Sequence, residues 1–118
     1  AHIMLPDSKA IRNSQQNLAK FADTGIVELI KQMEALGAKK NRLEAKIAGG
    51  ATMFQFRQNP DTVVVGERNV EATKQKLKEL NIPILAEDCG KDYGRTQFFD
   101  SATGEMKIKA ALRGEWVY

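Results

Sequence analysis

The stretch at residues 43–54 (LEAKIAGGATMF) most restricts the folds open to this chain. Its first part, residues 43–48, is mostly apolar but too short for a convincing helix, and two glycines close it, so the pattern predicts a buried strand. Glycine carries no Cβ, which opens backbone angles closed to other residues and lets another chain segment or a ligand approach the main chain. A plain turn uses the same residue types, but four residues here are candidates for the wall of a substrate groove: Gly49, Gly50, Ala51 and Thr52.

The size and composition predict one compact domain with its own core, since the chain has 118 residues, 42% of them hydrophobic and 28% charged. No apolar stretch approaches the length of a membrane span, so no membrane insertion is expected. The single cysteine, Cys89, excludes an internal disulfide framework and a cysteine-cluster zinc site, and it favours a reducing cytoplasm. The sequence also lacks phosphate-binding glycine loops of the P-loop or dinucleotide type and metal-ligand spacing, so we expect no metal site.

The net charge of +3 is compatible with nucleic-acid binding, but its distribution favours another interpretation. Lysines and arginines are spread along the chain and interleaved with acids, as in residues 74–79 (KQKLKE). This pattern is typical of a solvated helix face rather than of a phosphate-binding stripe. We therefore expect no nucleic-acid partner.

The periodicity of apolar residues predicts two helices among several short strands. Residues 23–36 and 67–80 repeat at helical spacing, and in the first helix Met33 and Leu36 are expected to face the core. Strands are expected at residues 1–6, 43–48, 54–56, 63–65 and 82–86, with a long loop at 7–20. Residues 95–100 and 105–112 are expected to form a hairpin around a loop that ends in Gly104, and residues 113–118 cannot be placed. This order predicts an α/β domain with helices packed on a mixed sheet.

Few side chains are candidates for chemistry. His2 is the only histidine; a surface or partly buried polar residue is the ordinary interpretation, and a general base that takes a proton from a thiol or water is the functional one. Cys89 is more simply a small buried residue than a nucleophile, because Glu87 and Asp88 would raise the pKa of its thiol. Asp88 is expected to join Arg95 and Arg68 in a structural charge network.

Six short motifs, taken in order, resemble the CheD family of chemoreceptor glutamine deamidases. They are residues 2–6 (HIMLP), 21–24 (FADT), 45–51 (AKIAGGA) followed by Met53-Phe54, 65–70 (VGERNV), 86–88 (AED), and Gly94-Arg95. The resemblance extends from Ala1 to about Lys109. It implies a three-layer α/β/α sandwich with a mixed β-sheet, formed by residues 1–118 as a single deamidase domain that is incomplete at its N-terminus.

The resemblance further implies that the protein hydrolyses glutamine side chains of methyl-accepting chemoreceptors to glutamate, in the cytoplasm and without a cofactor. The family uses a Cys-His-Thr constellation, and His2 falls on its catalytic histidine. The family's cysteine and threonine lie upstream of that histidine. Cys89 does not replace the cysteine, because it falls in a later turn where relatives carry a small residue.

Family members also bind CheC, a phosphatase of CheY-phosphate, which gives an alternative function. The chain would then be a non-catalytic module that binds and stimulates a CheC-type partner. Phe54 and Phe56, beside the glycine pair, are candidates for the contact patch, and burial in the core is an equal alternative. A hydrolase that uses Cys89 itself is a third and poorer hypothesis.

Overall fold

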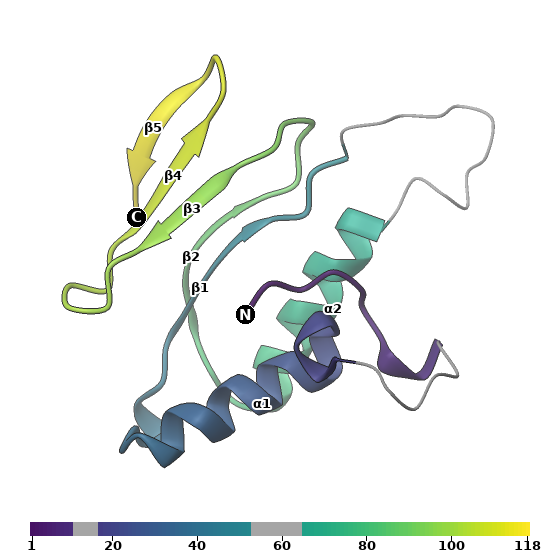
Figure 1. Ribbon diagram of the computed structural model, residues 1–118, viewed down its shortest axis with the longest axis vertical. Coiled ribbons are helices and arrows are strands. Elements are labelled where there is room, and N and C mark those ends of the chain that lie inside the picture. Colours follow the sequence, from purple (N-terminus) through teal and green to yellow (C-terminus); the bar gives the residue numbers. More distant parts are fainter. Residues whose placement is uncertain (11–16, 53–64) are drawn as a thin grey trace.

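Residues 1–10, 17–52 and 65–118 are described by a computed structural model, and in these ranges the chain forms two α-helices and five strands (Figure 1). The helices are α1 (Ala22–Ala35) and α2 (Val65–Glu79). The strands are β1 (Ala45–Gly49), β2 (Ile84–Cys89), β3 (Thr96–Phe99), β4 (Met106–Ala110) and β5 (Gly114–Val117). Short 3-10 turns occupy Ser8–Ala10, Leu18–Lys20 and Lys40–Arg42.

The strands form two sheets of different kinds. β1 and β2 are parallel, with Ala45 opposite Ile84 and Gly49 opposite Cys89, and α2 lies between them in the sequence. β3, β4 and β5 form an antiparallel meander in chain order. The combination of helices with parallel and antiparallel pairs confirms the predicted mixed α/β class.

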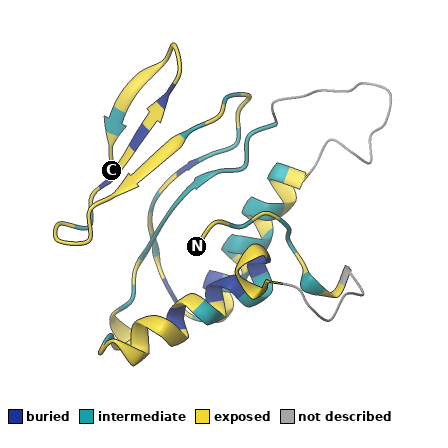
Figure 2. Cartoon of the chain, viewed as in Figure 1, coloured by how far each residue is buried: buried dark blue, intermediate teal, exposed yellow. Residues whose placement is uncertain are grey.

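The main core lies between the two helices and the parallel pair. Its buried residues come from α1, α2 and the loop before β2, and side chains of β1 and β2 pack on them (Figure 2). They are Ile26, Ile30, Leu77 and Ile82. A second buried stripe alternates along β4, where Met106, Ile108 and Ala110 are buried while Lys107 and Lys109 are exposed.

Helix α1 begins at Ala22, slightly before the predicted start. The carboxylate of Asp23 accepts hydrogen bonds from the backbone amide and the hydroxyl of Ser8, and the hydroxyl of Thr24 donates to the carbonyl of Leu18. These side chains therefore fasten the preceding loop to the helix. The prediction that Met33 and Leu36 face the core is wrong, since they are 37% and 90% exposed.

The N-terminal strand predicted at residues 1–6 is reduced to one bridge between Leu5 and Phe21. The backbone amides of Met4 and Leu5 both donate to the carbonyl of Lys20, so the segment is held by the loop before α1. Val65, predicted to end a strand, begins α2 instead. Residues 54–56 and 63–64, also predicted as strand, lie outside the described residues.

The C-terminal half agrees closely with expectation. The hairpin of β3 and β4 is confirmed, with a positive φ of 76° at Gly104 in its loop. β2 runs to Cys89, farther than predicted, and the unplaced tail supplies β5. Among the described residues, no helix is both long and apolar enough to cross a bilayer.

Candidate functional site

The glycine pair at the end of β1 meets the start of α2. A Cβ on Gly50 would lie 2.2 Å from Cγ2 of Val70 and 2.9 Å from the carbonyl oxygen of Gly66, and a Cβ on Gly66 would lie 2.7 Å from the carbonyl oxygen of Gly50. Gly50 also has a φ of 70°, which side chains rarely adopt. The close approach allowed by Gly50 is therefore made by the chain itself, whereas none of the described residues lies within 4 Å of a Cβ built on Gly49.

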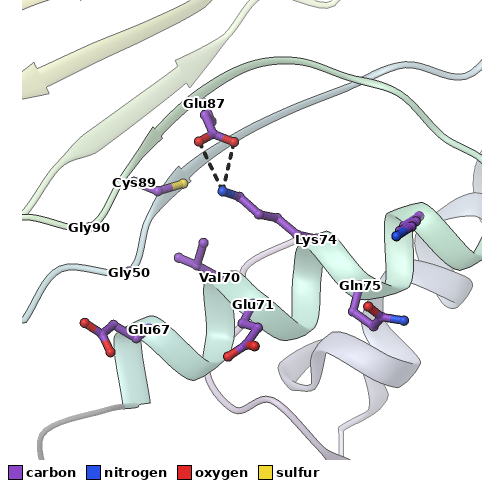
Figure 3. Close-up of a pocket in the computed structure, with 10 residues that line it drawn as sticks. Gly50, Glu67, Val70, Glu71, Lys74, Gln75, Glu87, Cys89 and Gly90 are labelled. Carbon is purple, nitrogen blue, oxygen red and sulfur yellow. Dashed lines mark hydrogen bonds and ion pairs between the residues drawn. The ribbon is translucent and has the colours of Figure 1, made fainter.

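An open groove of about 510 Å³ lies between α2 and the ends of β1 and β2 (Figure 3). Gly50 and Gly90 border it on the strand side, and Val70 and Lys74 on the helix side. The ammonium group of Lys74 pairs with the carboxylate of Glu87 at 3.1 Å and so connects α2 with β2. Of the four predicted groove residues, Gly50 lines this groove and the other three do not.

Cys89 also lines this groove from the end of β2, and its surroundings make it a poor nucleophile. Burial raises the pKa of its thiol above the ordinary value, and the charge of Glu87 raises it further. The positive charges of Lys74 and Arg95 offset only part of this increase. Little thiolate is therefore present at neutral pH. The predicted effect of Glu87 is confirmed, whereas Asp88, also predicted to raise this pKa, lowers it through a backbone hydrogen bond.

Asp88, beside Cys89, is the centre of a buried polar network. Its carboxylate accepts hydrogen bonds from Nε of Arg95 at 2.7 Å, from the hydroxyl of Tyr118 at 2.8 Å and from the indole of Trp116. Arg95 also donates to the carbonyls of Gly90 and Tyr93. The network ties β2 to β5 and to the turn between β2 and β3.

Burial alone would raise the pKa of Asp88, but the bonds from Trp116, Tyr118 and Arg95 outweigh burial and hold it below the usual range. The predicted pairing of Asp88 with Arg95 is thus present. Arg68, expected in the same network, is exposed and does not hydrogen-bond to Asp88. Sequence reasoning missed Trp116 and Tyr118, because their role depends on where the unplaced tail lies.

His2 lies at the opposite end of the chain and is exposed. The residue after it, Ile3, packs against the core between the helices. His2 is not among the residues that line the groove beside Cys89. Phe54 and Phe56 lie outside the described residues. Within those residues, no three histidine, cysteine or acidic side chains lie close enough together to hold a metal ion.

Comparison with known proteins finds a matching family and several relatives of high sequence identity. Residues 4–110 match the family described as CheD chemotactic sensory transduction. The chain is 58% identical over 109 residues to a probable chemoreceptor glutamine deamidase CheD of Lachnoclostridium phytofermentans, covering 92% of this chain and 67% of that protein.

Two further relatives are named for the same activity. The chemoreceptor glutamine deamidase CheD of Halalkalibacterium halodurans is 51% identical over 115 residues, which is 98% of this chain and 71% of the relative. A probable chemoreceptor glutamine deamidase CheD of Clostridium botulinum is 52% identical over 114 residues, or 97% of this chain and 70% of the relative. With a family match across most of its length and relatives at this identity, the chain belongs to the CheD family.

Proposed function

We propose that this chain carries the greater part of a chemoreceptor glutamine deamidase, which hydrolyses receptor glutamine side chains to glutamate. The observation that carries the proposal is the identity of 51–58% with relatives named for this activity. The match extends over more than nine-tenths of this chain. Its single cysteine is consistent with a reaction in the reducing cytoplasm.

In the proposed reaction, His2 acts first as a general acid and then as a general base. A cysteine thiolate attacks the carbonyl carbon of the glutamine side chain, and His2, as the imidazolium, gives a proton to the nitrogen, so that ammonia leaves and a thioester remains. The neutral imidazole then takes a proton from water as the water oxygen attacks the thioester. The carbon–sulfur bond breaks, which returns the thiolate and releases glutamate.

The nucleophile of this reaction is not Cys89. Its raised pKa leaves little thiolate, and it lies in a groove that His2 does not line. We therefore propose that a cysteine N-terminal to Ala1 attacks the substrate, as in the family that the chain resembles. Residues 1–118 would then form one deamidase domain together with that N-terminal segment.

The substrate is proposed to enter along the end of β1. Among the described residues, no heavy atom lies within 4 Å of the position of a Cβ on Gly49, which leaves the main chain there open to a bound side chain on the side that these residues form. Ala51 and Thr52 follow it, and Thr52 donates a backbone hydrogen bond to the carbonyl of Lys91. The reaction adds a negative charge to a receptor helix, which alters repulsion between neighbouring helices.

The decisive experiment follows ammonia release from a chemoreceptor fragment by the deamidase with its nucleophilic cysteine. His2→Ala should lower kcat by roughly 10²- to 10⁴-fold, because the leaving nitrogen loses its proton donor. Met4→Ala, at an exposed position two residues later, is the matched control and should retain activity. A His2→Ala enzyme as fast as the parent would remove His2 from catalysis.

A second function is favoured by the poor nucleophilicity of Cys89: binding and stimulation of a CheC-type phosphatase. Phe54 and Phe56 are the proposed contact residues, because aromatic anchors dominate many protein interfaces. This 118-residue chain should then retain a CheC-type protein in a pull-down without releasing ammonia. Retention should fall when both phenylalanines are changed to alanine; no retention at micromolar concentration would exclude this function.

A further inference from the structure

The backbone that carries His2 is fixed on one side by hydrogen bonds to the start of α1. The amides of Met4 and Leu5 donate to the carbonyl of Lys20 at 2.8 and 2.9 Å, and the amide of Ala22 donates to the carbonyl of Leu5 at 3.0 Å. These bonds hold residues 4 and 5 but do not reach His2 itself. The position of His2 therefore depends on the residue between, Ile3.

Ile3 is held by its side chain. It is half-buried and packs against the cluster formed by Ile26, Ile30 and Leu77. Its Cδ1 atom lies where α1 presents Gly25, and a Cβ on that glycine would lie only 3.2 Å from Cδ1. The same Cβ would lie 3.0 Å from the carbonyl oxygen of Ala19. Gly25 therefore leaves the space in which Ile3 is seated.

Glycine at this position is otherwise unfavourable. Gly25 lies within the first turns of α1, where an alanine would favour the helix because it restricts the unfolded chain. Gly25 is also buried and its φ is not in the left-handed region, so no backbone angle requires glycine. We attribute the glycine at position 25 to its close contacts with Ile3 and the backbone of Ala19, which a side chain would crowd.

We infer that Gly25 and Ile3 are positioning residues for His2: the missing side chain of Gly25 admits Ile3, and Ile3 sets the place of the imidazole one residue away. The inference rests on the proposed role of His2. A Cβ at position 25 moves Ile3 by a few tenths of an ångström, and the rigid peptide between Ile3 and His2 passes this shift to the catalytic ring. Small displacements of a catalytic group reduce the rate of the chemical step.

The test combines Gly25→Ala with Ile3→Val in the deamidase that carries its nucleophilic cysteine. Gly25→Ala should lower kcat roughly tenfold while KM changes by less than about twofold. Ile3→Val removes Cδ1, the side-chain atom that the new Cβ would meet, and leaves the contact with the carbonyl oxygen of Ala19 unchanged, so the double variant should recover the part of the lost kcat that Ile3 causes. A double variant as slow as Gly25→Ala, or slower, overturns the inference.

Ile30→Val is the matched control. It removes the same methyl group from the same cluster, but from a residue of α1 and not from the segment that carries His2, so it should lower the unfolding temperature without changing kcat. An equal loss of kcat in Ile30→Val would mean that any loosening of the core slows the enzyme, which contradicts a specific positioning role.

A measurement without turnover separates this inference from the proposed function. The imidazole Cε1–H signal, assigned by its loss in His2→Ala, should shift in Gly25→Ala and return toward the parent position in the double variant. No shift in Gly25→Ala overturns the positioning role. If instead His2→Ala deamidates at the parent rate while the signal shifts as expected, the catalytic role of His2 fails and the positioning of its ring stands.

Discussion

Replacing Asp88 by asparagine should remove a large share of the stability of this fold. The Asp88 side chain is 5% exposed and that of Arg95 is 2% exposed, with Nε and Oδ1 2.7 Å apart. Asparagine occupies the same volume but leaves the buried guanidinium without its counter-charge. The guanidinium also donates to the carbonyls of Gly90 and Tyr93, but these are neutral acceptors and do not replace the lost charge.

Removing one partner of a buried ion pair costs about 3–5 kcal/mol. Domains of this size are stable by about 5–15 kcal/mol, so the variant should be folded only marginally or with a much lower midpoint. Urea denaturation followed by circular dichroism gives the free energy of unfolding through α1 and α2. The fluorescence of Trp116, the only tryptophan, reports on the network itself.

The control is the neighbouring residue on the same strand. Glu87 pairs with Lys74 at 3.1 Å, but both side chains are more than 40% exposed, so Glu87→Gln should cost less than about 1 kcal/mol. If Asp88→Asn costs no more than Glu87→Gln, the buried network does not hold β2 to β5 and the reasoning is refuted.

The difference in the free energy of unfolding between the parent and Asp88→Asn should depend on pH. The pKa of Asp88 lies below its usual value in the folded chain, so the unfolded chain binds its proton first as the pH falls. The stabilisation is complete above the unfolded aspartate pKa of about 3.9 and is lost as the pH falls through the lower folded pKa. The stability gap between the parent and Asp88→Asn should therefore narrow below about pH 4; a gap that widens there would contradict the assignment.

Three other variants or measurements test the remaining geometry. Gly50→Ala should cost about 2 kcal/mol more than Gly49→Ala: both glycines have a positive φ that strains an alanine, but among the described residues only the Cβ at position 50 would clash, 2.2 Å from Val70. Equal shifts in thermal unfolding would contradict this. Nζ of Lys46 donates hydrogen bonds to the carbonyl oxygens of Gly104 and Tyr118. Lys46→Met removes this charged donor and should lower the free energy of unfolding, measured in urea, by about 1–3 kcal/mol; an unchanged midpoint would show that these bonds are weak. Cys89 should react with iodoacetamide at neutral pH more slowly than an unfolded peptide cysteine, and labelling at the peptide rate would disprove its raised pKa.

The helices and the hairpin could be predicted from the sequence because their signals are local. Apolar residues at helical spacing located α1 and α2 to within a few residues, and the loop ending in Gly104 located the turn between β3 and β4. The exposure of Met33 and Leu36 shows the limit of this signal. Periodicity identifies an apolar face, but whether another element covers that face depends on tertiary structure.

The errors concern features set by partners distant in the sequence. Residues 113–118 contain too few residues for a period, and only pairing with β4 makes them a strand. The bonds from Trp116 and Tyr118 to Asp88 depend on that pairing and could not be predicted without it. At the site, the glycine pattern indicated a close approach to the main chain. It could not distinguish a ligand from the start of α2, which is what Gly50 contacts.

The parallel arrangement of β1 and β2 has a consequence for the folding of this chain. Every residue of α2 lies between the two strands, so their ladder closes a long loop, whereas β3 pairs with β4 and β4 with β5, which follow one another in the sequence. Closing a long loop costs conformational entropy before the contacts between its ends can offset that cost, so local hairpins form faster than pairings between distant strands. The meander is thus expected to form early, and the pairing of β2 with β1 is expected to be the step that limits the rate of folding.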